Sequence, residues 1–157
     1  MGNKWIRWTG LGLVGLIGLL QIIPVWALRT NPPVVSEPNW PSPETKALAQ
    51  RACYDCHSNE TVWPWYSYVA PLSWLVIIDT VRGRREMNFS DWANAAPDDP
   101  DEMEEVIEEG EMPPANYLLL HPAAQLTSAE RQQLLQALQQ MTPASKQEED
   151  EENEAQP

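Results

Sequence analysis

The feature that most constrains the fold of this chain is the segment at residues 53–57, which reads Cys-Tyr-Asp-Cys-His. Cys53 and Cys56 are the two cysteines of the sequence, and His57 follows the second of them directly. On a helical turn, residues three and four positions apart lie on the same face. Two thiols in this arrangement can form thioethers with the vinyl groups of one haem, and the adjacent imidazole can bind its iron. The pattern therefore predicts one covalent haem c, attached at Cys53 and Cys56 with His57 as an axial ligand.

Two other sites could use the same cysteines. A thioredoxin-like dithiol is typical of a βαβ unit, and no such pattern of strands and helices surrounds this segment. A structural zinc site needs four ligands, whereas His121 is the one further histidine and no second Cys-x-x-Cys is present. Haem attachment is the favoured interpretation.

The N-terminal part contains an uncharged apolar stretch over residues 8–28, with Lys4 and Arg7 before it and Arg29 after it. A helix of about 21 residues would cross the roughly 30 Å hydrocarbon core of a bilayer. The basic residues before the stretch predict a cytoplasmic N-terminus over residues 1–7 and export of everything that follows. We therefore expect a single transmembrane anchor over residues 8–28, in the cytoplasmic (inner) membrane, with the rest of the chain in the periplasm.

A cleaved signal peptide is the alternative for the same stretch. Residues 11–20 would form its apolar centre, and the small-residue pattern at residues 25–27 resembles a cleavage site. Both interpretations place the cysteine segment outside the cytoplasmic membrane.

Three segments are predicted beyond the anchor. Residues 29–42 are rich in proline and should form an extended spacer. Residues 43–142 should form the haem-binding domain. Residues 143–157 are acidic and lack aromatic residues, so we expect a disordered tail.

The charge of the exported part bears on its partners. It carries 8 basic and 23 acidic side chains, a net charge of about −15. This charge argues against nucleic acid as a partner and permits docking on a basic redox protein.

Local signals predict that residues 43–142 are all helical. Ser42 with Pro43, Asp99 with Pro100, and the Thr127–Glu130 capping box each resemble the start of a helix. Further helical segments are expected at residues 72–81 and 91–95. The apolar run at 72–81 is rich in β-branched residues and could form a strand, but it lacks alternation and a second strand. The expected fold is all-α, a small cytochrome c-like domain behind one N-terminal transmembrane helix.

A haem bound by His57 has a sixth iron position to fill. The chain offers five candidate ligands: Met87, Met103, Met112, Met141 and His121. Met112 is favoured because it follows a predicted helix end at Gly110 and precedes a rigid pair of prolines. Met103 and Met141 lie on apolar helix faces, where a role in the core is expected. Sulfur ligation at Met112 favours electron transfer, while an open site favours sensing or gas binding.

Groups around the haem can also be predicted. A backbone carbonyl near Pro64 is a candidate acceptor for the second ring nitrogen of His57. Aromatic residues that follow the motif could wall the haem: Trp63, Trp65 and Tyr68. A basic cluster could pair with its propionates: Arg82, Arg84 and Arg85.

Several runs together resemble the bacterial haem-binding domain family of small c-type cytochrome-like proteins. They are residues 52–61, Trp63-Pro64-Trp65-Tyr66, Gly83-Arg84, Asn88-Phe89-Ser90, Met112-Pro113-Pro114 with Tyr117, and Leu120-His121-Pro122. The resemblance covers roughly residues 45–141. It implies one covalent haem in a mostly helical domain, attached at Cys53 and Cys56, with His57 proximal and Met112 in the position of the distal ligand. It also implies an N-terminal membrane helix in many members, but no defined reaction.

The most direct interpretation is a membrane-tethered monohaem electron carrier that exchanges electrons with an unidentified redox protein. The alternative is a haem-based sensor or ligand-binding module with an exchangeable sixth site. A haem enzyme is disfavoured, because the sequence shows one haem motif and no persuasive distal acid–base pair.

Overall fold

The computed structural model describes residues 2–23 and 25–141 of the chain. Within these ranges every regular element is a helix, which confirms the all-α prediction. The elements are α1 (Gly2–Leu20), η1 (Val25–Leu28), α2 (Pro43–Ala52), α3 (Tyr54–His57), η2 (Trp65–Tyr68), α4 (Leu72–Glu86), α5 (Trp92–Ala95), α6 (Pro100–Glu108), α7 (Ala115–Leu118), η3 (Pro122–Ala124) and α8 (Ser128–Met141). The acidic tail expected over residues 143–157 lies outside the described residues.

The N-terminal helix differs from the predicted membrane span. α1 begins at Gly2, includes Lys4 and Arg7, and ends at Leu20, eight residues before the predicted end. Among the helices that the structure describes, none is both long and apolar enough to cross a bilayer. The apolar stretch is divided because Gln21 leaves the helix and pairs with Ala70, its side-chain amide donating to the carbonyl and accepting from the N–H.

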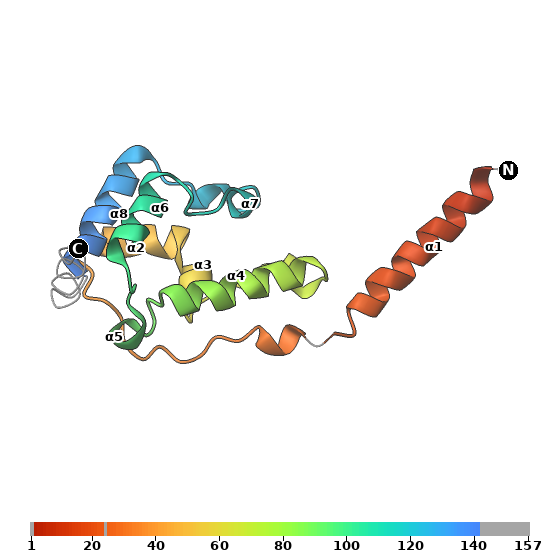
Figure 1. Cartoon of the computed structure of the whole chain (residues 1–157), viewed down its shortest axis with the longest axis horizontal. Coiled ribbons are helices and arrows are strands. Elements are labelled where there is room, and N and C mark those ends of the chain that lie inside the picture. Colours follow the sequence, from red (N-terminus) through yellow and green to blue (C-terminus); the bar gives the residue numbers. More distant parts are fainter. Residues whose placement is uncertain (1, 24, 142–157) are drawn as a thin grey trace, which may run out of the picture.

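The proline-rich residues 29–42, called the strap below, run along the domain rather than away from it (Figure 1). The N–H groups of Val35 and Ser36 both donate to the Ser90 carbonyl, at 2.8 and 3.2 Å. Ser36 in turn accepts from Trp92 N–H. α1 extends away from the remaining helices, so the strap joins an isolated helix to a packed domain (Figure 1).

The predicted helix starts are confirmed. Ser42 caps α2 by accepting from the Thr45 N–H, and Asp99 caps α6 by accepting from the Glu102 N–H. At the start of α8, the Thr127 hydroxyl accepts from the Glu130 N–H while the Glu130 carboxylate accepts from the Thr127 N–H. The run at residues 72–81 is helical and continues as α4 to Glu86.

The core lies where α8 packs against α2 and α6. Leu134 and Leu138 of α8 are almost fully buried, and Phe89 stacks between Tyr54 and Trp92. Met103 and Met141 belong to this core, as their places on apolar helix faces predicted. α4 packs against α3 on the other side of the domain, and α7 lies across a gap from α4 (Figure 1).

Candidate haem site

The cysteine segment forms a single helical turn at the end of α2. α2 stops at Ala52, and Cys53 caps α3 by accepting from the N–H groups of Cys56 and His57 at 3.1 and 2.9 Å. Cys53, Cys56 and His57 stand three and four positions apart along this turn. Cys53 packs against the hydrophobic core. Both thiols are free. Burial raises the pKa of Cys53 to about 12 and that of Cys56 to about 11, so both thiols are protonated at neutral pH.

His57 is oriented by a backbone carbonyl, although not by the predicted one near Pro64. Its Nδ1 lies 3.2 Å from the carbonyl oxygen of Met87, the residue that ends α4. Since a carbonyl can only accept, Nδ1 carries the proton and Nε2 keeps its lone pair for a metal. Burial lowers the pKa of His57, which favours the neutral ring that iron requires. The backbone carbonyl of His57 also accepts from Phe89 N–H at 2.8 Å.

α4 approaches the motif so closely that a side chain could not fit between them. A Cβ placed on Gly83 would lie 2.7 Å from the carbonyl oxygen of Cys56. Glycine at this position allows α4 to bring the Met87 carbonyl to His57.

An open cleft lies beside the attachment turn, with about 730 Å³ of empty space including its mouth. One wall is the face of α4 that carries Leu72, Leu75 and Val76, and Cys56 lines the same space. Residues of α7 and the segment after it also line the cleft: Asn116, Tyr117, Leu120 and His121. The mainly apolar lining suits a planar, largely apolar cofactor. Of the attachment motif, Asp55 and Cys56 line the cleft, whereas Cys53 and His57 do not.

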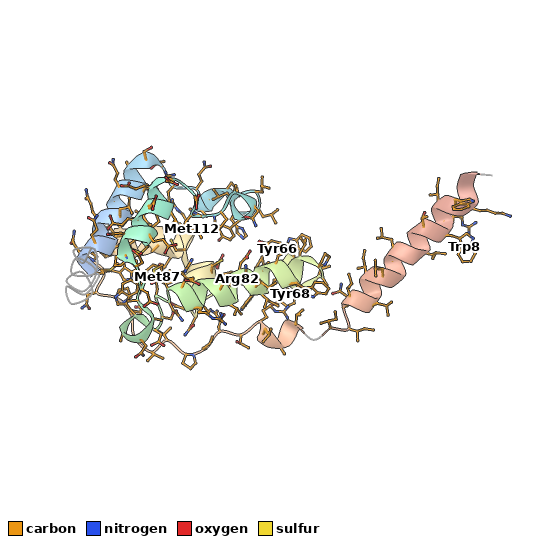
Figure 2. All side chains as sticks on the ribbon, in the orientation of Figure 1. Trp8, Tyr66, Tyr68, Arg82, Met87 and Met112 are labelled. Carbon is orange, nitrogen blue, oxygen red and sulfur yellow. The ribbon has the colours of Figure 1, made fainter. Side chains whose placement is uncertain are left out.

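Met112 lies on the loop between α6 and α7, and its side chain is 40% exposed (Figure 2). Its N–H donates to the Val106 carbonyl, so the loop folds back on α6. The cleft lining does not include Met112, whereas it does include His121. The side chain of Met87 is buried, and its carbonyl orients His57. Of the five candidate sixth ligands, His121 is therefore the one that shares the cleft with Cys56.

Polar residues that sequence reasoning did not single out surround His121. The Tyr117 hydroxyl donates to the Asp55 carboxylate at 2.8 Å, and the other Asp55 oxygen accepts from Val62 N–H at 2.9 Å. The Tyr66 hydroxyl lies 3.3 Å from Nε2 of His121. The position of Asp55 between the two motif cysteines was the one signal that could have marked it as part of the site.

Arg84 does not fit the predicted role as a propionate partner. Its guanidinium donates to the carbonyl oxygens of Ser58 and Thr30 at 2.6 and 2.9 Å, and to the side chains of Asn31 and Thr61 at 3.1 and 2.8 Å. These bonds hold the strap against the domain. Arg82 and Arg85 are exposed to solvent.

The aromatic wall is also different from the predicted one. Trp63 donates its indole N–H to Asn31, Trp65 is 77% exposed, and Tyr68 stacks under Arg29. None of these three lines the cleft, whereas Tyr66 and Tyr117 do.

The sequence profile described as the haem-binding domain matches residues 15–140. No curated protein and no solved structure matches the chain. The matched range includes the attachment turn, the cleft and most of the helices around it, so the chain belongs to the haem-binding domain family.

Proposed function

We propose that this protein is a monohaem c-type cytochrome-like electron carrier. Cys53 and Cys56 form the thioethers, His57 is the proximal iron ligand, and Met112 is the sixth ligand. The haem, when bound, supplies one-electron chemistry at its iron. The protein is a carrier and not a catalyst in this proposal, and its electrons pass to and from another redox protein.

One observation carries this proposal. Two free thiols and an imidazole with its proton held on Nδ1 lie on one helical turn, and one of the thiols, Cys56, lines an open cleft with a mainly apolar lining. Metal-binding histidines commonly donate the second ring N–H to a carbonyl, as His57 does to Met87. The residues present therefore fit a covalent haem.

The covalent attachment can be tested directly. The protein would be produced with cytochrome-maturation machinery, denatured and stained for haem after electrophoresis. We expect haem to stay with the wild-type chain and to be lost from Cys53→Ala/Cys56→Ala. Met103→Leu, a conservative change in the buried core that removes no thiol, is the matched control. Haem retention by the double variant after denaturation would refute the proposal.

The alternative is a sensor or ligand-binding module with an exchangeable sixth site. The 40% exposure of Met112 and its absence from the cleft lining favour this alternative. A reduced spectrum that carbon monoxide leaves unchanged would support the carrier. A rapid shift on adding carbon monoxide would support the sensor.

The N-terminal segment is the basis for a proposal on location. We propose that it directs export, so that the haem domain faces the periplasm, and that it holds the protein at the cytoplasmic membrane. The apolar side chains of α1 support this, since Leu11, Val14 and Leu19 are each more than half exposed. The test is resistance of the protein to carbonate extraction from membranes, together with its digestion by protease added to spheroplasts. Digestion only after lysis would contradict this topology.

A further inference from the structure

The two histidines of the described chain share one arrangement. Nδ1 of His57 lies 3.2 Å from the Met87 carbonyl, and Nδ1 of His121 lies 3.1 Å from the Tyr117 carbonyl. In both rings the carbonyl selects the tautomer with the proton on Nδ1. In both rings Nε2 is therefore left with an unprotonated lone pair, the form in which imidazole binds iron.

The ring of His121 is also held in place. It stacks on Tyr117 with ring centres 4.0 Å apart and planes 13° from parallel. Tyr117 is fixed in turn by its 2.8 Å bond to Asp55, a residue of the attachment motif. The imidazole is thus linked through two side chains to the turn that carries Cys56, and it lines the same cleft.

Nε2 of His121 has one weak partner. The Tyr66 hydroxyl lies 3.3 Å away, near the long end of the hydrogen-bond range. Tyr66 also lines the cleft, and its hydroxyl lies 3.5 Å from Nδ1 of the same ring, so it does not bond Nε2 alone. If Nε2 binds the iron, the Tyr66 hydroxyl loses this contact and can rotate to another acceptor. The His121 ring gives up no proton in this change.

We infer that His121 is a second protein ligand for the haem iron, one that occupies the sixth position whenever Met112 does not. This inference rests on the proposed function and extends it. In the exchange the iron–sulfur bond to Met112 breaks and an iron–nitrogen bond to Nε2 forms, with no change in oxidation state or proton number. Tyr117 and Asp55 act as positioning residues.

The experiment uses four full-length proteins matured with haem: wild type, Met112→Leu, His121→Phe and the double variant. Leucine preserves the volume of Met112 without its sulfur, and phenylalanine preserves the stacking of the ring on Tyr117. Ferric optical and electron paramagnetic resonance spectra report the ligands, and redox titration reports the potential. Carbon monoxide binding to the reduced protein reports an open site.

We expect Met112→Leu to remain low-spin, to lose the sulfur-to-iron charge-transfer band, and to have a lower reduction potential, as bis-histidine ligation requires. His121→Phe should keep the wild-type spectrum. The double variant should become high-spin and bind carbon monoxide rapidly. Added imidazole should restore its low-spin spectrum.

A high-spin Met112→Leu protein that binds carbon monoxide as fast as the double variant would overturn the inference. A high-spin His121→Phe protein would support coordination by His121 and would instead remove Met112 from its proposed role. Absence of covalent haem from the wild-type protein would overturn the proposed function, and this inference with it.

Discussion

Gly83 is the residue on which the geometry of the attachment turn depends most directly. An alanine there would place its Cβ 2.7 Å from the Cys56 carbonyl oxygen and 3.0 Å from its carbonyl carbon. Backbone atoms cannot rotate away, so either α4 or the turn must move. We expect Gly83→Ala to lower the free energy of unfolding by roughly 1–3 kcal/mol, which exceeds the gain of about 1 kcal/mol in helix propensity. Urea denaturation of the matured protein measures this change.

Gly12→Ala is the matched control, because a Cβ on Gly12 meets nothing within 4 Å. A Gly83→Ala protein as stable as this control, with its haem spectrum unchanged, would show that the close approach of α4 is dispensable.

Single residues were predictable where their partners are close in the sequence. Ser42, Asp99 and Thr127 cap helices because each bonds a backbone group three residues away. The acceptor of His57 was missed because Met87 is 30 residues distant and is brought near only by packing of α4. No local signal distinguishes its carbonyl from any other.

Among the elements, the strap depends on Arg84 of α4. Four hydrogen bonds from this guanidinium reach residues before and after the attachment turn, Thr30, Asn31, Ser58 and Thr61. We expect Arg84→Ala to lower the free energy of unfolding by roughly 2–4 kcal/mol, since it leaves partly buried acceptors without a donor. The measurement is chemical denaturation, accompanied by hydrogen exchange at the Val35 and Ser36 amides.

Exposed Arg85→Ala provides the control, since it removes the same charge one residue away. Equal losses of stability in the two variants would indicate a general charge effect instead of specific bonds to the strap.

Arg51 of α2 forms an ion pair with Glu130 of α8, and this pair depends on the charge of the Glu130 carboxylate. Bonds from Thr127 and from Arg51 lower the pKa of Glu130 to about 2, below its ordinary value of 4.5. A lowered carboxyl pKa stabilises the fold above about pH 4.5 and loses this effect as pH falls toward 2. We expect Arg51→Ala to raise the Glu130 pKa without restoring 4.5, because the Thr127 backbone bond remains. Carboxyl NMR titration measures it, and an unchanged pKa would show that Arg51 makes no contribution.

The sequence predicted which segments are helices better than it predicted where they end. α4 and α6 have strong apolar patterns or caps, and both form. α1 was misplaced at both ends, and the apolar pattern could not show that Gln21, just past its C-terminal end, pairs with Ala70, 49 residues away. The proline content of the strap indicated an extended backbone but not the side chains that hold it.

For the whole molecule, the cleft makes stability depend on the cofactor. Leu75 and Leu120 line the cleft and are 56% and 59% exposed. A haem that covers them removes apolar surface from water at about 25 cal/mol per Å². We expect Cys53→Ala/Cys56→Ala, freed of haem, to melt several degrees below the matured protein and to bind the dye ANS strongly. Equal melting temperatures would show that the cofactor adds nothing to the fold.

The overall arrangement was only partly predictable. Haem binding followed from five consecutive residues, and the family match agrees with it. The walls of the cleft come from α4 and from residues 116–121, which the chain brings together through long-range packing. Because this packing is not visible in the sequence, the sequence did not predict that Tyr66 and Tyr117 line the cleft.

The strap also determines how the protein meets other molecules. A linker that makes no contact with the domain would let the domain change its orientation around the point of attachment. The domain could then reach a partner by local diffusion. Here Arg29, Asn31 and Ser36 are bonded to the domain, so these residues of the strap cannot act as a free linker. With the membrane attachment proposed above, we expect the rate of encounter with a partner to change little when residues are inserted in the strap between these bonded positions, and to rise when the bonds are removed.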